Sequence, residues 1–308
     1  MRRNVPAVEY HRGREAASTP AVTGAAADWP TFGGSNARTN DNTAASKITA
    51  ANVGTMVRQQ VTISAPIDAG LIYLSGVKVN GALHDVYFGT TNVGRTVAID
   101  ANAGKVLWEY APPGFDEAAA VAGAKVGARG LTVKQITNST PVADANRQFI
   151  YAASADGKVT KIAIADGKAV WSTAVTRLPN MEKLDSPLSF VQGTVLVPTA
   201  GYVGDTPPYQ GHIAVIDAKS GAVRKVWNSL CSDRAELLDP ATCSQGQSAI
   251  WGRAPGSWSN PIPATCCSPP ATARGMARPP GAMPSSCWTP VRRRCWPTGR
   301  PRTRTTTI

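Results

Sequence analysis

The chain has 308 residues and a formal charge of +12 at neutral pH, but the charge is divided unevenly along it. Residues 1–252 carry 23 Lys and Arg against 20 Asp and Glu, whereas residues 253–308 carry nine Arg and no Lys, Asp or Glu. No apolar run reaches the length of a membrane span, which excludes an integral membrane segment, and 6% aromatic with 17% charged residues excludes a long coiled coil.

Residues 1–27 are predicted to form a disordered leader. Arg2, Arg3, Arg12 and Arg14 make a basic start, and residues 25–27 are three alanines that resemble a cleavage region. A signal peptide also needs an apolar core of about 7–15 residues between these parts, and this stretch contains none. The sequence therefore carries no recognisable signal peptide.

A repeated pattern follows between residues 97 and 227. Segments 97–108, 162–171 and 214–227 each read as a strand, a tight turn with Asp and Gly, and a second strand that ends in Trp. A further hairpin precedes each segment, so that the repeating unit has about four short strands. This predicts an all-β fold built as a partial β-propeller, with three to four blades. The alternative is a β-sandwich in which three such hairpins occur by coincidence.

The closing tryptophans are too large to lie exposed three times, so we expect them to pack between neighbouring blades. The aspartate is expected to bond its own turn and the glycine to allow a positive φ. The predicted blade-docking residues are Asp100, Gly104, Trp108, Asp166, Gly167, Trp171, Asp217, Gly221 and Trp227.

These residues resemble the quinoprotein-dehydrogenase-like propellers, whose blades carry an Ala-x-Asp-x-x-x-Gly-x-x-x-Trp docking motif. The stretch Asp28-Trp29-Pro30-Thr31-Phe32-Gly33-Gly34 is similar to the segment before the first blade of such enzymes. The resemblance implies a propeller domain over residues 28–254, from a ring of eight blades, and a periplasmic or secreted location. It also implies two possible functions. One is an alcohol or sugar oxidoreductase that holds pyrroloquinoline quinone and calcium; the other is a non-catalytic propeller that binds proteins or glycans.

Residues 255–308 do not continue the pattern. Their Arg and Pro content allows a nucleic-acid-binding arm or a disordered extension, but a reading-frame shift near Ala254 explains the composition better. In the shifted frame, Cys266-Cys267 must encode Leu and Trp288-Thr289 must encode Asp, and the translation can form a fourth blade. We therefore expect a disordered tail without nucleic-acid binding, and a ring cut short. We also reject Cys266-Cys267 as the vicinal disulfide of quinoprotein alcohol dehydrogenases.

Few other residues suggest chemistry. Cys231 and Cys243 are predicted to form a local disulfide, with two free thiols as the alternative. His84 and His212 lie beside predicted strands with no metal-binding spacing, so no metal site is predicted. The loop carboxylates of Glu182, Asp185 and Asp205 are candidates to line a funnel at one end of the propeller, although solvated loop charges are the commoner outcome. The sequence as it stands therefore favours a binding or scaffold propeller without a recognisable catalytic group, and its substrate class is not predicted.

Overall fold

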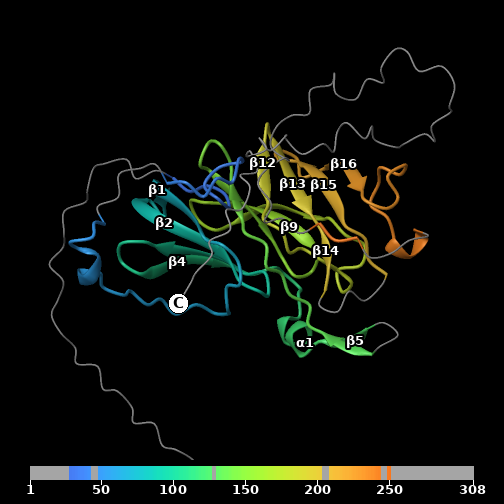
Figure 1. Cartoon of the computed structure of the whole chain (residues 1–308). Coiled ribbons are helices and arrows are strands. Elements are labelled where there is room, and N and C mark those ends of the chain that lie inside the picture. Colours follow the sequence, from blue (N-terminus) through green and yellow to red (C-terminus); the bar gives the residue numbers. More distant parts are fainter. Residues whose placement is uncertain (1–27, 43–47, 127–129, 203–207, 244–247, 251–308) are drawn as a thin grey trace, which may run out of the picture.

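The computed structural model describes residues 28–42, 48–126, 130–202, 208–243 and 248–250. Three four-stranded antiparallel sheets make up most of this part of the chain and lie side by side in chain order (Figure 1). This confirms the predicted all-β propeller fold. The leader and the tail from residue 255 lie outside the described residues, as does Asp205.

Blade 1 contains β1 (Ile72–Val79), β2 (Ala82–Thr90), β3 (Thr96–Asp100) and β4 (Lys105–Tyr110). Blade 2 contains β7 (Val142–Ala143), β8 (Phe149–Ala153), β9 (Lys158–Ala163) and β10 (Ala169–Ala174). Blade 3 contains β12 (Ser189–Val191), β13 (Thr194–Pro198), β15 (His212–Asp217) and β16 (Val223–Asn228). In every blade the strands pair in sequence order, which is the meander expected of a propeller.

The blades are joined by two hydrophobic cores, one for each pair of neighbouring sheets. The first lies between blades 1 and 2 and includes Ile72, Phe88 and Trp108 of blade 1 with Ile150 and Ile162 of blade 2. The second lies between blades 2 and 3 and includes Tyr151 and Val159 with Val195 and Ile216. Alternating residues of one strand thus face two different cores, as Ile150 and Tyr151 do.

The segment before blade 1 crosses the first strands of all three blades. Trp29 exchanges backbone hydrogen bonds with Tyr73 in β1, and Ala143 in β7 donates its N–H to the carbonyl oxygen of Pro30. Further along, Arg38 Nη2 donates to Ser189 Oγ in β12 at 2.8 Å. The segment therefore ties the three inner strands together where they converge.

Several elements lie outside the repeats. The helix α1 (Glu117–Ala122) and the hairpin of β5 (Ala124–Val126) and β6 (Leu131–Val133) form an insertion below the sheets in Figure 1. Strands β11 (Glu182–Lys183) and β14 (Ala200–Gly201) form a second small sheet. Two 3-10 turns, η1 (Val53–Thr55) and η2 (Pro240–Thr242), lie before blade 1 and after blade 3. No helix in the described ranges has the length and hydrophobicity needed to cross a bilayer.

Candidate functional site

Trp108 packs on a glycine turn of the next blade. A methyl group added to Gly167, in the turn between β9 and β10, would fall 2.8 Å from the indole of Trp108. The indole Nε1 of Trp108 also donates a hydrogen bond of 2.9 Å to the carbonyl oxygen of Ile164. Trp108 is 8% exposed, so this contact is part of the core between blades 1 and 2.

Trp171 makes the corresponding contact with blade 3. A methyl group on Gly221 would fall 2.8 Å from its indole, as at Gly167. The carbonyl oxygen equivalent to that of Ile164 belongs to Ala218, three residues before the glycine in both turns. That oxygen accepts from Lys161 Nζ at 3.0 Å instead, and the buried Nε1 of Trp171 has no hydrogen-bond partner.

Blade 3 differs from blades 1 and 2 at the docking position. Trp108 and Trp171 each come four residues after the turn glycine, and the residue four after Gly221 is Lys225. The pairing of the strands supports this equivalence. Trp108 pairs with Ala98, Trp171 with Lys161 and Lys225 with Val215. The partner residue lies six residues before the turn glycine in all three blades. Trp227 is half-buried two residues further along and matches Tyr110 of blade 1.

The aspartates of the motif hold two of the three turns. Asp100 Oδ1 accepts from the backbone N–H groups of Asn102 and Ala103, and Asp217 Oδ1 accepts from those of Lys219 and Ser220. The hydrogen bonds from Ser220 are the largest cause that lowers the pKa of Asp217 to about 2.

In blade 2 the equivalent position is held by Ala163, whose carbonyl oxygen accepts from Gly167 N as that of Asp100 does from Gly104 N. The sequence pattern groups Asp166 with Asp100 and Asp217, but Asp166 directly precedes Gly167 and does not lie four residues before it. It accepts from the backbone N–H of Lys168 and pairs with Lys168 Nζ at 3.0 Å.

The first docking turn, at Gly104, is covered by a polar side chain from the segment before blade 1. The end of the Gln59 side chain lies 2.5 Å from the position of an added methyl group, and Gln59 Nε2 donates to Asn102 O at 3.2 Å. Gln59 is exposed. The three glycine turns of the described blades are therefore covered by Gln59, Trp108 and Trp171 in chain order.

A buried polar cluster lies where blades 2 and 3 meet β11 and β14. Glu182 is 1% exposed, and its Oε2 accepts from Thr176 Oγ1 while its Oε1 accepts from Gln210 N at 3.3 Å. His212 Nδ1 lies 3.8 Å from Glu182 Oε1, and His212 Nε2 donates to Val175 O at 2.6 Å. Burial raises the pKa of Glu182, although His212 and the hydrogen bonds from Thr176 and Gln210 oppose that rise.

The second carboxylate that the sequence suggested for a funnel is also paired. Asp185 lies 2.6 Å from Lys183 Nζ, and both side chains are largely buried. The expectation that solvated loop charges would occur here is wrong for Glu182 and Asp185, because the loop before blade 3 folds back against β14 and takes them out of solvent.

These carboxylates do not fit a calcium site of the quinoprotein kind. Calcium is coordinated by six to eight oxygen atoms that face it directly, and both oxygens of Glu182 already accept hydrogen bonds from the protein. Asp185 is neutralised by Lys183. Within the described ranges, moreover, no three side chains of His, Cys, Asp or Glu come together in a way that suits a metal ion.

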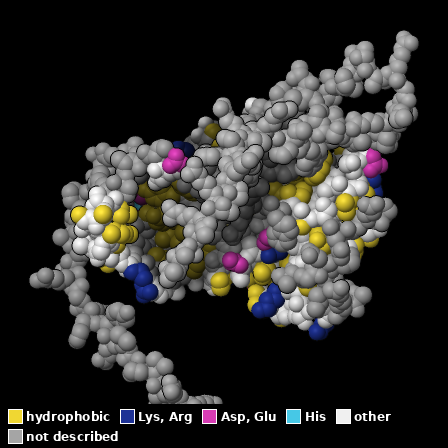
Figure 2. Space-filling model, viewed as in Figure 1, with side chains coloured by type: hydrophobic (Ala, Val, Ile, Leu, Met, Phe, Trp, Pro, Cys, Tyr) yellow, Lys and Arg dark blue, Asp and Glu magenta, His cyan; other side chains and the backbone are white. Residues whose placement is uncertain are grey.

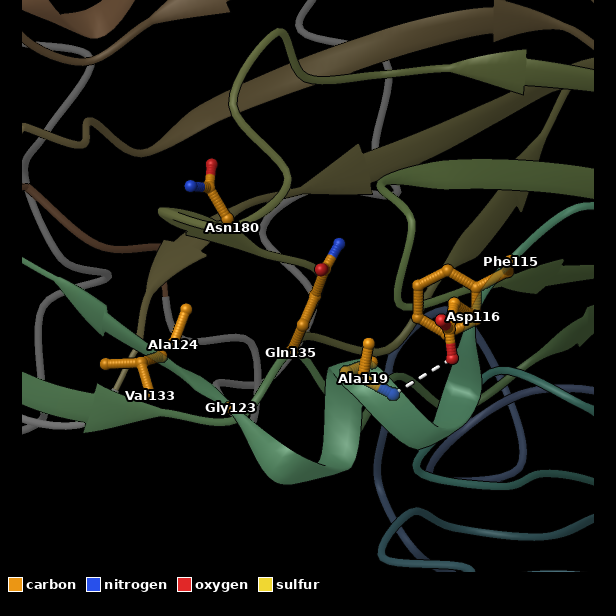
Figure 3. A pocket seen from close by; sticks show the side chains of 9 residues that line it. Phe115, Asp116, Ala119, Gly123, Ala124, Val133, Gln135 and Asn180 are labelled. Carbon is orange, nitrogen blue, oxygen red and sulfur yellow. Dashed lines mark hydrogen bonds between the residues drawn. The ribbon is translucent and has the colours of Figure 1, made fainter.

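A cavity of about 360 Å³ lies between the insertion and the loop before β11 (Figure 3). Its lining is mostly apolar, with Phe115, Ala119 and Val133 among the lining residues. Two of its polar side chains are already used: Asp116 accepts from Ala119 N at the start of α1, and Gln135 Nε2 donates to Ala155 O. The size suits a small ligand, but these bonded groups supply no catalytic pair.

The remaining predicted residues lie apart from this cluster. Cys231 and Cys243 are joined, with their sulfur atoms 2.08 Å apart, beside η2. His84 Nδ1 lies 2.6 Å from Asp100 Oδ2 in blade 1. Sequence reasoning missed the buried cluster because Thr176, Glu182, Gln210 and His212 are separated by loops and no spacing links them.

Comparisons with known proteins agree with this architecture. The family model described as outer membrane protein assembly factor BamB (PQQ_2) matches residues 34–234. A quinohemoprotein alcohol dehydrogenase, ADH IIB of Pseudomonas putida, is 25% identical over 178 residues. That alignment covers 56% of this chain and 24% of the dehydrogenase, so the chain spans about a quarter of the length of this curated relative.

Two solved structures show similarity at lower identity. The quinohemoprotein alcohol dehydrogenase of Comamonas testosteroni is 20% identical, with 70% of this chain and 29% of that chain covered and a TM-score of 0.47. BamB of Moraxella catarrhalis is 14% identical, with 53% and 50% covered and a TM-score of 0.32. Because the family model covers well over half of the sequence, the chain belongs to the PQQ-dehydrogenase-like family of β-propeller repeat proteins.

Proposed function

We propose that this protein is a non-catalytic binding propeller, a scaffold whose blade faces and loops hold another protein. The observation that carries the proposal is the state of Glu182. A carboxylate that acts as a general base or binds a metal must reach the reacting group or the ion directly. Glu182 is 1% exposed and both of its oxygens accept hydrogen bonds within the protein, so it serves to join blades 2 and 3.

The second candidate function is a dehydrogenase that uses pyrroloquinoline quinone and calcium. The similarity to a quinohemoprotein alcohol dehydrogenase favours it. In such an enzyme the bound quinone would accept a hydride from an alcohol or sugar. The carboxylates of Glu182 and Asp185 would first have to leave Thr176 and Lys183 before they could serve such a site.

A titration of the full chain with the quinone, with and without calcium, separates the two functions. The absorbance of the quinone and the fluorescence of the tryptophans report binding, and reduction of an artificial electron acceptor in the presence of an alcohol reports turnover. We expect no saturable, calcium-dependent change in either signal. A saturable change that requires calcium, with a stoichiometry near one quinone per chain, would reject the scaffold function.

We further propose that residues 255–308 arise from a shifted reading frame and that the protein acts outside the cytoplasm. The absence of Lys, Asp and Glu after residue 253 supports the first proposal, and the joined Cys231 and Cys243 support the second. The nucleotide sequence around codons 250–260 tests the frame. A single added or removed base that restores the docking pattern is the expected result, and an intact frame in independent isolates would contradict it.

A further inference from the structure

The contact between successive blades follows one rule in the described chain. The residue four places after a turn glycine lies on the glycine turn of the next blade, and the residue six places after it contacts the same neighbour. In blade 1 these residues are Trp108 and Tyr110, and Tyr110 packs against the core shared with blade 2. In blade 2 they are Trp171 and Thr173, and Thr173 Oγ1 donates to Gly221 O at 2.6 Å.

In blade 3 the same two positions lie on the side of the sheet that faces away from blade 2. They are occupied by Lys225, which is exposed, and Trp227, which is half-buried. Leu196 and Val215 pair across β13 and β15 and are also only half-buried, in contrast to Val195 and Ile216, which are fully covered by blade 2. This face combines one lysine with a surrounding set of apolar side chains.

The side of blade 1 that faces away from blade 2 is covered at Gly89 by Ile67 and Leu71, and exposed apolar side chains lie beside that cover. Leu83 and Tyr87 of β2 are 75% and 40% exposed, and Val106 of β4 is 38% exposed. They lie on the side of the sheet opposite to Val86 and Phe88, which face blade 2. Figure 2 shows hydrophobic side chains over this part of the molecule, where blade 1 and η1 lie.

The turn at Gly104 resembles the two turns that hold tryptophans. Gly104 has φ +62°, against +72° at Gly167 and +79° at Gly221, and its N–H donates to Asp100 O at 2.9 Å. Its cover, the amide of Gln59, is exposed and donates a hydrogen bond to Asn102 O in this turn. A flexible exposed side chain is displaced at lower cost than a packed indole.

We infer that blade 3 of one copy of this protein docks on blade 1 of a second copy, with Lys225 on the Gly104 turn and Trp227 against the apolar side chains beside it. The ammonium group of Lys225 would donate hydrogen bonds to carbonyl oxygens of that turn, as Lys161 Nζ donates to Ala218 O between blades 2 and 3. Trp227 would occupy the place that Tyr110 has in the first interface.

This inference does not depend on whether the propeller is catalytic, because it uses only the outer faces of the described blades 1 and 3. Analytical ultracentrifugation of the full chain over about 1–100 μM tests it. We expect the wild-type chain to self-associate and Leu83→Asp to weaken the association at least tenfold. Leu83 is 75% exposed, so the substitution leaves the fold unchanged, which circular dichroism checks. Trp227→Ala should weaken the association to a similar extent.

Two further variants make the test specific. Gln59→Trp would cover the Gly104 turn with an indole of the same chain and should therefore reduce self-association while raising the midpoint of thermal unfolding. Val170→Asp, at a 54% exposed position on β10 of blade 2, is the matched control and should associate as the wild type does. A wild-type chain that stays monomeric at 100 μM would overturn the inference. So would association that is unchanged by Leu83→Asp, Trp227→Ala and Gln59→Trp, or that is lost equally in Val170→Asp.

Discussion

The indole N–H of Trp108 donates a hydrogen bond to the carbonyl oxygen of Ile164 in the next blade, at 2.9 Å. Trp171 has the equivalent position in blade 2. The oxygen equivalent to Ile164 O is Ala218 O, and it accepts hydrogen bonds from Lys161 and Tyr151 instead of from Trp171. The packing of an indole on a glycine turn is thus repeated between blades, whereas the hydrogen bond is not. Packing is therefore the shared part of the contact.

The two tryptophans should respond differently to replacement by phenylalanine. Trp108→Phe removes part of the packing and leaves Ile164 O, a buried acceptor, without its donor. Trp171→Phe removes a similar part of the packing but no hydrogen bond. We expect Trp108→Phe to lower the free energy of unfolding by about 1 kcal/mol more than Trp171→Phe, measured by urea unfolding. Equal losses would show that the hydrogen bond to Ile164 contributes nothing.

The buried carboxyl group of Glu182 should make stability depend on pH. Burial raises its pKa in the folded state above the ordinary value of a glutamate, so the folded state binds a proton more tightly than the unfolded state does. The resulting stabilisation is present at low pH and is lost as the pH rises through the window between the unfolded and the folded pKa. Glu182→Gln should remove this loss.

Urea unfolding of wild type and Glu182→Gln at several pH values from about 4 to 7 measures the difference. Glu236→Gln is the control, because Glu236 is an exposed glutamate paired with Arg234 and its pKa is lowered rather than raised. Parallel pH profiles for wild type and Glu182→Gln would refute this account of the buried cluster.

The link between Cys231 and Cys243 closes a loop of 12 positions after blade 3. A cross-link of this span restricts the unfolded chain and is expected to contribute about 2–4 kcal/mol. Replacement of both cysteines by serine should lower the unfolding free energy by that amount, and a reducing agent should destabilise the wild type but not the double variant. Peptide mapping of the unreduced protein gives an independent check, and detection of both residues as free thiols would exclude the link.

Most of the blade architecture could be predicted from the sequence because its signals are local. A strand, an Asp/Gly turn and a second strand lie within about a dozen residues, so the periodic pattern shows them directly. The position of the third docking residue also has a local signal, because the spacing of four residues from glycine to tryptophan in blades 1 and 2 leads from Gly221 to Lys225. A search for tryptophan alone selects Trp227, whereas the strand register places Lys225 at the position equivalent to Trp108.

Asp166 departs from the motif in a way that the sequence itself shows, because it directly precedes Gly167, whereas Asp100 and Asp217 come four residues before their glycines. The buried polar cluster, in contrast, depends on distant residues and left no local signal. Glu182 and His212 meet only because a loop of blade 3 returns to β11, so their burial and pairing follow from the tertiary fold. Helix α1 and the β5–β6 hairpin are a local insertion that no repeat pattern predicts.

The packing of tryptophans on glycine turns is tested most directly by one pair of substitutions. Gly167 and Gly193 have nearly the same φ, +72° and +74°, so alanine brings the same backbone strain at both. At Gly193 a methyl group meets no atom within 4 Å, and at Gly167 it meets the indole of Trp108 at 2.8 Å. We predict that Gly167→Ala lowers the unfolding free energy by about 1–3 kcal/mol more than Gly193→Ala. Equal losses at the two positions would contradict the view that this contact joins the blades.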